Sequence, residues 1–320
     1  MLSRVADNLY WMSRYLERAE HAARLLDVNL NLMLDESTST ADRRWKRVLA
    51  ALGNRPNLAW SSDAYQVAQI LTFDPGNRSS ITACVAAARE NARQVREEIS
   101  SDQWQRLNHL FHQVTRYKPN QTDDVLPSDF LLAVIEGVHL IQGVTDSTMS
   151  HGEGWHFIQV GRYMERACAT VTLLGLYHRE FWGHPDQTPE AAEYLEWIGL
   201  LRSCTAFEAY CKVYTADLTP DRIFEFLLLD EEFPHSVRFS IDSVQCALEK
   251  IQGDSGKSRA EALQRLSGKL RASLSYSSVE EILSQDVVVY LRGIQAQCRA
   301  IHETIYELYV DYSIQAALAG

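Results

Sequence analysis

One six-residue pattern occurs twice in this chain and constrains its fold more than any other feature. Residues 14–19 read Arg-Tyr-Leu-Glu-Arg-Ala, and residues 162–167, 148 positions further on, read Arg-Tyr-Met-Glu-Arg-Ala. On an α-helix the two arginines and the glutamate of this pattern lie at positions i, i+3 and i+4, so all three project from one face. The repeat therefore predicts two related helices that present the same charged groups.

Two further matches follow in the same order along the chain. Trp45 matches Trp197 at an offset of 152 residues, and residues 71–81 match residues 227–237 at an offset of 156. Small loop insertions shift such offsets slowly, and three ordered matches therefore indicate a duplicated unit. We expect two tandem, diverged helical repeats, packed as one compact unit, that cover residues 1–148 and residues 149–320.

The spacing of apolar residues predicts an all-α fold, a helical bundle. In the first thirty residues, Val5, Leu9, Met12 and Leu16 lie on one side of a helix, and charged residues occupy the other side. The same period continues through both halves, and no convincing period-2 strand pattern occurs. The predicted helices cover residues 1–30, 42–53, 61–73, 79–99, 101–116, 127–148, 153–182, 189–215, 219–229, 235–252, 257–274 and 278–315.

Composition and charge bound the classes of partner. With 46% hydrophobic and 23% charged residues among 320, the chain has the balance of a globular protein. A net charge of −11 argues against a general nucleic-acid or anionic-membrane surface. Six scattered cysteines fit neither a disulfide framework nor a zinc site. No leader-like segment opens the chain and no apolar run approaches the ~20 residues of a membrane span, so we expect a cytoplasmic protein.

The main candidate binding residues are the charged side chains of the repeated pattern. The neighbours of the pattern differ between its two copies: His21 and Arg24 in the first correspond to Ala169 and Thr172 in the second. The three charged side chains of the second copy therefore have small neighbours, and we expect them to be buried. The first Arg-Glu-Arg set is Arg14, Glu17 and Arg18, and the second Arg-Glu-Arg set is Arg162, Glu165 and Arg166.

Each set has one more arginine than glutamate, and burial of that surplus charge is costly unless an acid or an anionic ligand meets it. Arginine favours planar, bidentate contact with carboxylate or phosphate. One hypothesis is therefore a cleft, lined by both sets, that binds an anionic peptide or carboxylate ligand. The alternative is that acids elsewhere in the chain neutralise the arginines and the sets only tie helices together.

A second basic stripe occurs in one copy only. Arg89, Arg93 and Arg96 lie at positions i, i+4 and i+7 of a predicted helix. This stripe could make a single anion-binding pocket asymmetric. The alternative is a solvated face on which Glu90, Glu97 and Glu98 pair with the arginines.

Metal and nucleotide signatures are weak or absent. Glu153 and His156 have the i, i+3 spacing of carboxylate-bridged di-iron bundles, but such sites need a second motif and two further glutamates, which the sequence lacks. A hydrogen-bonded helix start accounts for the pair more simply. Phosphate-loop and dinucleotide patterns are also missing, so no cofactor is expected.

With these motifs in place, the chain resembles the bacterial Alpha-E family, named for its helices and its Glu-Arg motif. The resemblance covers nearly the whole chain and is carried by residues 2–11, 15–20, 79–81, 88–93, 154–155, 161–166 and 226–237. The sequence differs from the family pattern at residues 234–236, where it has Pro-His-Ser and the family is expected to have Pro-Arg-Ser. A role for an arginine at that point is therefore in doubt.

The resemblance implies a partner rather than a reaction. Alpha-E proteins are typically encoded beside, or fused to, a circularly permuted ATP-grasp protein, often with a transglutaminase-like protease. The resemblance therefore implies that this chain is an accessory protein of an ATP-grasp-type ligase, which acts in the synthesis or modification of a peptide or amide bond. Two alternatives stay open, an enzyme that uses Glu17 or Glu165 as a base and a purely structural helical scaffold.

Overall fold

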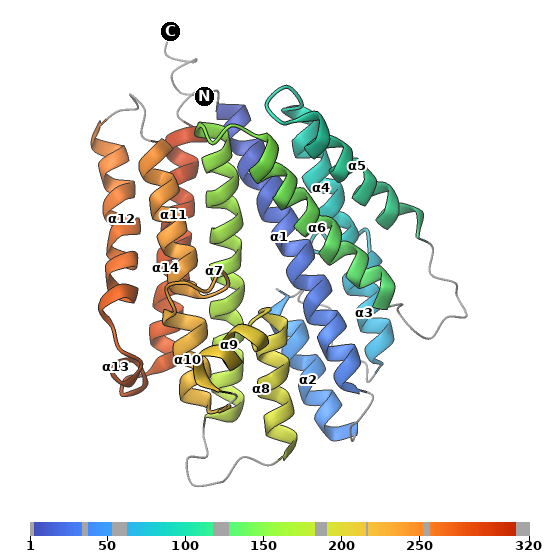
Figure 1. Cartoon of the computed structure of the whole chain (residues 1–320), viewed down its shortest axis with the longest axis vertical. Helices are drawn as coiled ribbons and strands as arrows, with labels where there is room; N and C mark the ends of the chain where they lie inside the picture. The colour runs from blue at the N-terminus through green and yellow to red at the C-terminus, as the bar shows by residue number, and fades with distance from the viewer. Residues whose placement is uncertain are drawn as a thin grey trace. The chain divides into compact units, whose positions relative to one another are not determined.

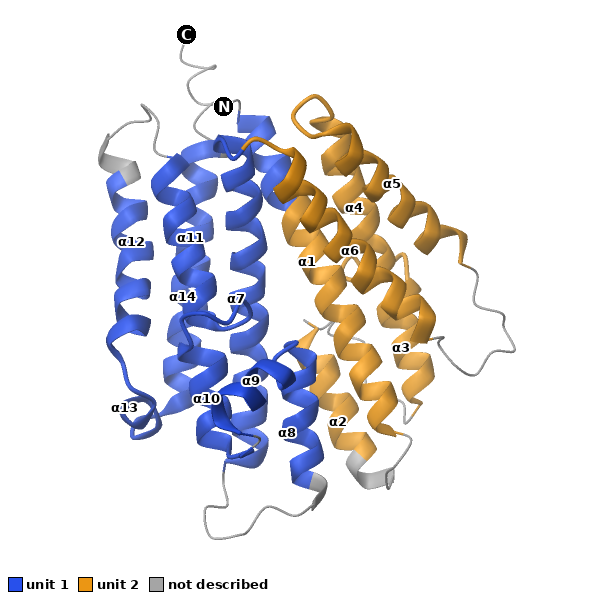
Figure 2. Ribbon diagram, in the orientation of Figure 1, with its two compact units in different colours: residues 1–11, 151–320 blue, residues 12–150 orange. Residues whose placement is uncertain are grey.

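The computed structural model describes residues 3–33, 38–52, 63–117, 128–182, 191–215, 217–251 and 257–311. Within these ranges every regular element is a helix and no strand occurs, so the predicted all-α class is confirmed (Figure 1). The chain divides into two compact units, residues 12–150 and residues 1–11 with 151–320 (Figure 2). The N-terminal helix α1 (Ser3–Leu32) contributes its first turns to one unit and the rest to the other.

The unit of residues 12–150 contains most of α1 and five further helices. Neighbours in sequence pack together here: α3 against α4, α4 against α5, and α5 against α6. Trp45 is fully buried in its core, and its indole N–H donates a hydrogen bond to the Met33 sulfur at 2.9 Å. The five helices are α2 (Thr38–Ala51), α3 (Ala64–Phe73), α4 (Ile81–Gln94), α5 (Ser101–Arg116) and α6 (Ser128–Thr148).

The other unit is built around the long helix α7 (Glu153–Phe181). Helices α11 and α14 pack along α7, and α12 packs against both of them (Figure 1). Trp197, the counterpart of Trp45, is likewise buried, at 1% exposed. The remaining elements are α8 (Ala191–Ser203), α9 (Phe207–Tyr214), α10 (Pro220–Leu229), α11 (Val237–Ile251), α12 (Lys257–Tyr276), α13 (Val279–Leu283), α14 (Val287–Tyr306) and the π-helical turn η2 (Glu307–Asp311).

The matched turns α3–α4 and α10–α11 have the same local geometry. Asp74 and Asp230 each end a helix and accept backbone N–H groups of the turn. Ser80 and Ser236 then accept the N–H three residues further on, at 3.3 and 3.0 Å, which caps the next helix. Sequence positions that match between the two halves therefore adopt matching structures at this point, while the duplication itself stays a prediction.

Three predicted helices are longer than the helices observed: two are interrupted and one ends early. The helix predicted over 189–215 is interrupted because Thr205 adopts a left-handed conformation, with φ of 53°, which is rare for a β-branched residue. The helix predicted over 278–315 breaks before Asp286, whose carboxylate caps α14 by accepting two backbone N–H groups. Helix α4 ends at Gln94, five residues before the predicted end, because Val95 leaves the helical region.

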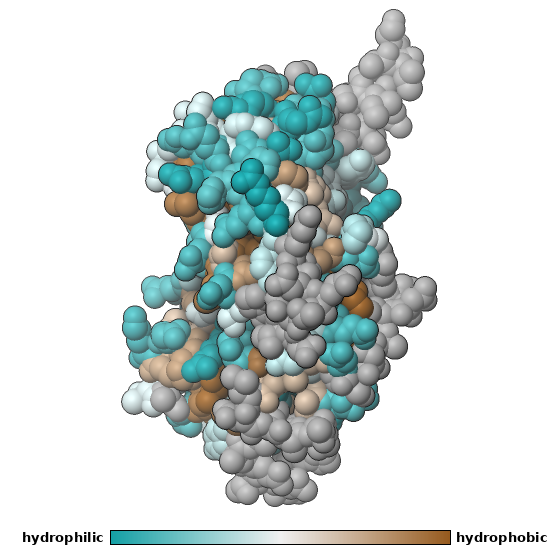
Figure 3. Space-filling view, turned by 90° about the vertical axis from the view of Figure 1, so that its right-hand side faces the viewer, coloured by the Kyte–Doolittle hydropathy of each residue, from teal (hydrophilic) through white to brown (hydrophobic). Residues whose placement is uncertain are grey.

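One described helix, α6, is long and apolar enough to cross a membrane by length and composition alone. A helix of this kind is weak evidence, because the core helix of a soluble protein passes the same test. Phe130, Leu131 and Val134 of α6 are in fact buried. On the face drawn in Figure 3, hydrophobic residues are scattered among hydrophilic ones.

Candidate functional site

The second Arg-Glu-Arg set lies in the middle of α7 and is buried in the way the sequence predicted for its arginines. Arg162 is 7% exposed and Arg166 is 9% exposed, whereas Glu165 is half-buried. The neighbouring residues on the helix are small and apolar, and such residues pack in the interior. Arg162 and Arg166 have different hydrogen-bond partners, and the two residues are therefore described in turn.

Arg166 is held by the protein itself. Its guanidinium donates a hydrogen bond to the backbone carbonyl of Pro234 at 3.2 Å and lies 5.3 Å from the centre of the Tyr163 ring. One turn along α7, the Thr170 hydroxyl donates to the carbonyl of His235 at 3.0 Å. These contacts fasten α7 to the turn before α11, so Arg166 has a structural role.

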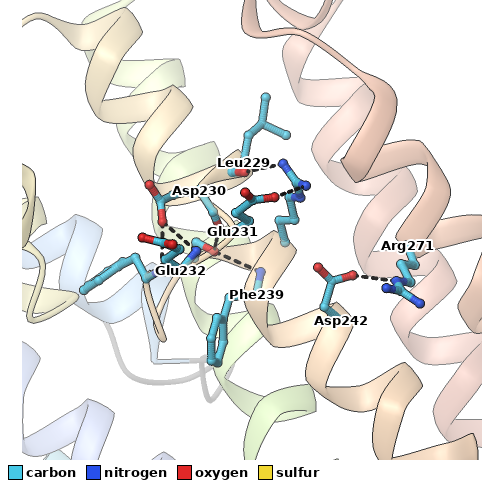
Figure 4. Close-up of polar contacts among 10 residues, drawn as sticks. Leu229, Asp230, Glu231, Glu232, Phe239, Asp242 and Arg271 are labelled. Carbon is cyan, nitrogen blue, oxygen red and sulfur yellow. Dashed lines mark hydrogen bonds and ion pairs between the residues drawn. The ribbon is translucent and has the colours of Figure 1, made fainter. Parts of the chain in front are cut away.

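Figure 4 shows the region around that turn. The carboxylate of Asp230 accepts the N–H groups of Glu232 and Phe233 at 3.0 and 2.7 Å. Further along α11, Asp242 accepts from Arg271 of α12 at 2.9 Å. Where the family resemblance led us to expect an arginine, His235 therefore lies in a turn that is already rigidly bonded.

Arg162, by contrast, has almost no partner. Its one hydrogen bond within the described chain goes to the side-chain oxygen of Gln159, at 3.3 Å, and it makes no ion pair there. Gln159 is itself 4% exposed, and its side-chain N–H₂ group is buried without an acceptor among the described residues. A largely buried guanidinium with one hydrogen bond and a buried amide donor without a described acceptor thus lie on the same face of α7.

Gln159 is the residue that sequence reasoning missed. It lies three positions before Arg162, so helical geometry places the two on the same face. No motif marks it, and only its burial and its unpaired donor identify it. The local chemistry of Arg162 and Gln159 suits a carboxylate, which offers two acceptor oxygens and a compensating negative charge.

The first Arg-Glu-Arg set is arranged differently. Glu17 is 2% exposed and accepts a hydrogen bond from the side-chain amide of Gln142 on α6, at 3.1 Å. Arg14 and Arg18 are half-buried and interact with other groups of the protein, and Arg18 lies 5.7 Å from the Tyr15 ring centre. The side of α1 that looked polar in sequence is therefore partly buried, and a carboxylate is its most enclosed charge.

The stripe of Arg89, Arg93 and Arg96 matches the alternative of acidic partners only at Arg93, and Arg96 lies beyond the end of α4, where it donates to the Ile99 carbonyl at 3.2 Å. Arg93 is exposed and forms an ion pair with Glu90 at 2.7 Å, which helps to lower the pKa of Glu90 to about 2. Arg89 donates to Asn108 at 2.6 Å and lies over the Phe111 ring at 4.5 Å. These two arginines are thus occupied by the protein's own groups within the unit of residues 12–150.

Glu153 and His156 begin α7 as a helix start. Burial is the main cause of a lowered pKa of His156, whose Nδ1 atom is buried and has no hydrogen-bond partner in the part of the chain that the structure describes. No group of three or more His, Cys, Asp or Glu side chains that could hold a metal ion occurs in the described part of the chain. The weak metal alternative gains no support from this arrangement.

The fold and these sites define an all-α helical protein with paired Arg-Glu-Arg motifs, and comparison with known proteins places it further. The model of the Alpha-E family, described as a predicted alpha-helical domain with a conserved ER motif, matches residues 1–310. The chain belongs to the Alpha-E family, as the sequence resemblance indicated. No solved structure matches it significantly.

Its curated relatives are longer proteins. The chain is 26% identical to an uncharacterised protein of Mycobacterium bovis and to one of Mycobacterium tuberculosis, in each case over 330 aligned positions. The alignment covers 94% of this chain but 36% of each relative. The chain thus spans about a third of the length of these relatives.

Proposed function

We propose that this Alpha-E chain is a cytoplasmic helical partner of an ATP-grasp-type ligase, and that Arg162 binds a carboxylate of a peptide or acyl group in the joint reaction. ATP-grasp enzymes activate a carboxylate and join it to an amine. A helical partner with an unpaired buried guanidinium would hold such a carboxylate. A transglutaminase-like protein is a further candidate member of the same assembly.

The observation that carries the proposal is the scarcity of acceptors for Arg162 and Gln159 among the described residues. A largely buried guanidinium without an ion pair is costly to desolvate, and a buried amide donor without an acceptor adds about 1–3 kcal/mol. A carboxylate bound between them would offset both costs. Arg89, Arg93 and Arg166 already have partners in the protein, so the binding role is narrowed to Arg162.

The length of the relatives supports the partner half of the proposal. In the mycobacterial proteins the matched region is 36% of a longer chain. A helical module that is found within a larger protein is expected to work together with the remainder of that protein. The purely structural reading fits Arg166, whose bonds hold a turn, but it leaves Arg162 unexplained.

The test separates partner binding from carboxylate binding. The chain would be co-expressed with the ATP-grasp-type protein of the same organism, and complex formation measured by size-exclusion chromatography. A tetraglutamate peptide would then be titrated into the chain alone and into the complex by calorimetry. We expect a stable complex, saturable peptide binding, and a loss of at least about tenfold in peptide affinity, worth about 1.4 kcal/mol, for Arg162→Ala.

Arg93→Ala is the matched control, because Arg93 is exposed and paired with Glu90. It should leave both measurements unchanged. If a folded Arg162→Ala variant binds the peptide as well as the native chain does, the carboxylate site is wrong. If no complex forms, the partnership is wrong, whatever the peptide result.

A further inference from the structure

Helices α12 and α14 carry an excess of positive charge in a chain that is negative overall. The two helices pack against each other, and the short helix α13 joins them at one end (Figure 1). Together they contain seven lysines and arginines but two acidic residues, whereas the whole chain has a net charge of −11. Six of their exposed side chains form what we call the basic face: Arg265, Lys269, Tyr276, Val289, Arg292 and Arg299.

On each helix these side chains lie along one side. In α12, Lys269 follows Arg265 by four residues, and Tyr276 follows Lys269 by seven. In α14, Arg292 follows Val289 by three residues, and the second arginine comes seven residues later. Steps of three, four and seven residues return to the same side of an α-helix. Each helix therefore turns two cations and one hydrophobic side chain toward the outside.

The four cations of the basic face have no ion-pair partner within the described part of the chain. Their side chains also make no hydrogen bond to any residue that the structure describes. By contrast, Arg271 on another side of α12 donates to Asp242 of α11 at 2.9 Å. Glu261 and Glu303 each lie one turn from a cation of the basic face, yet neither forms an ion pair among the described residues. The outward-facing cations are therefore available to a partner.

The end of the basic face nearest α13 adds hydrophobic surface. Tyr276, at 87%, and Val289, at 61%, are the most exposed large hydrophobic side chains among the described residues. Tyrosine and arginine are enriched in protein–protein interfaces and supply many of the residues that dominate their binding energy. A nucleic acid or an anionic membrane would meet the exposed Glu280 and Glu281 of α13 and the negative charge of the whole chain. The face therefore favours a folded protein partner.

We propose that the basic face docks an acidic surface of the ATP-grasp-type partner, with Tyr276 as an aromatic anchor at one end. Acidic groups of the partner supply the counter-charges that the described part of this chain does not. Complementary charges of this kind speed encounter and fix orientation more than they add affinity. Salt screens exposed charges, so the complex should weaken as ionic strength rises.

This inference rests on the proposed function, for which it names the docking surface. The basic face and the carboxylate site use different residues: Arg162 is buried in α7, and the docking cations are exposed on α12 and α14. Changes on the basic face should therefore weaken the complex and leave the binding of tetraglutamate by the chain alone unchanged.

The experiment measures the affinity of the full chain for the purified ATP-grasp-type protein of the same organism by biolayer interferometry, at low ionic strength and at about 0.5 M salt. One variant combines Arg265→Glu with Lys269→Glu. At low salt it should bind at least about tenfold more weakly than the native chain, and high salt should weaken the native complex. A second variant, Arg292→Glu with Arg299→Glu, should behave in the same way.

The matched control combines Arg106→Glu with Arg116→Glu. Both arginines are exposed on α5 and make no ion pair among the described residues. The control changes the net charge by the same amount, so it separates a local effect from a general one, and it should bind as the native chain does. Tyr276→Ala should weaken the complex about fivefold and leave the unfolding temperature unchanged, because the side chain is 87% exposed.

Three results would overturn the proposal, and they differ in what else they remove. If both double variants bind the partner with native affinity, the docking surface is wrong and the partnership stands. If the native chain forms no complex, the surface and the proposed partnership are wrong together. If the native chain binds a single-stranded oligonucleotide or phosphatidylserine vesicles, and both double variants lose that binding, the face belongs to a polyanion. Circular dichroism of each variant checks that it is folded.

Discussion

The two Arg-Glu-Arg sets have the same sequence pattern but bury opposite charges. In the first set the enclosed group is Glu17, at 2% exposed, and the arginines are half-buried. In the second set the enclosed groups are Arg162 and Arg166, and Glu165 is half-buried. The same helical motif therefore faces different surroundings in the two halves.

The difference shows that one sequence pattern can meet partners from other elements in one place and lack them in another. Glu17 has a donor in Gln142, and Arg166 has an acceptor in the Pro234 carbonyl, so both serve packing. Arg162 alone among these buried charges has its one described hydrogen bond within its own helix. The proposed carboxylate binding rests on this difference.

The largest predicted contrast is between the two glutamates. Glu17→Ala removes a buried charged acceptor and should lower the free energy of unfolding by about 2–3 kcal/mol. Glu165→Ala removes a half-buried group and should cost about 1 kcal/mol or less. Urea unfolding followed by circular dichroism measures both. Equal losses would mean that the two sets are equivalent, and the contrast drawn here would fail.

A smaller effect should occur in both halves. Ser80→Ala and Ser236→Ala each remove the hydroxyl that caps a helix, and the loss of each cap should cost about 1 kcal/mol. The Ser236 hydroxyl also donates to the Asp230 carbonyl, so Ser236→Ala should cost somewhat more. Both serines are fully buried and accept the corresponding backbone N–H. Thermal unfolding of the two variants compares them directly. A normal stability for one variant and a clear loss for the other would show that the matched turns are not equivalent.

The smallest effect belongs to the exposed pair on α4. The pKa of Glu90 is lowered to about 2, first by its hydrogen bond with Arg93. A lowered carboxyl pKa contributes stability that is present above the ordinary value and is lost as the pH falls toward about 2. Arg93→Ala should therefore change stability only slightly at neutral pH and not at all below pH 2. Acid titration of both proteins measures this, and a large loss at pH 7 would contradict it.

Much of the fold could be predicted from the sequence, because helical periodicity is a local signal. The existence of nearly every helix was readable from the spacing of apolar residues. The break at Thr205 was not, since a left-handed residue at a helix end is usually glycine or asparagine, and a threonine there gives no such signal. The break before Asp286 did have a capping residue, which the strong apolar period concealed.

The candidate site was only partly predictable for a physical reason. The position of Arg162 on a helix face follows from its spacing, but the partners of a buried charge come from other elements and depend on packing. The sequence therefore could not distinguish Arg166, which meets a carbonyl, from Arg162, which does not. It also could not reveal Gln159, which no motif marks and whose buried donor is seen only in the structure.

The most direct test of the central claim is the unfolding free energy of Arg162→Met, measured by urea denaturation with and without tetraglutamate. Methionine fills a similar volume without a charge that needs a partner. We predict that the variant is as stable as the native chain or about 1–2 kcal/mol more stable, and that the peptide stabilises only the native chain. A loss of about 3 kcal/mol or more, of the kind that follows removal of one partner of a satisfied buried pair, would contradict the account.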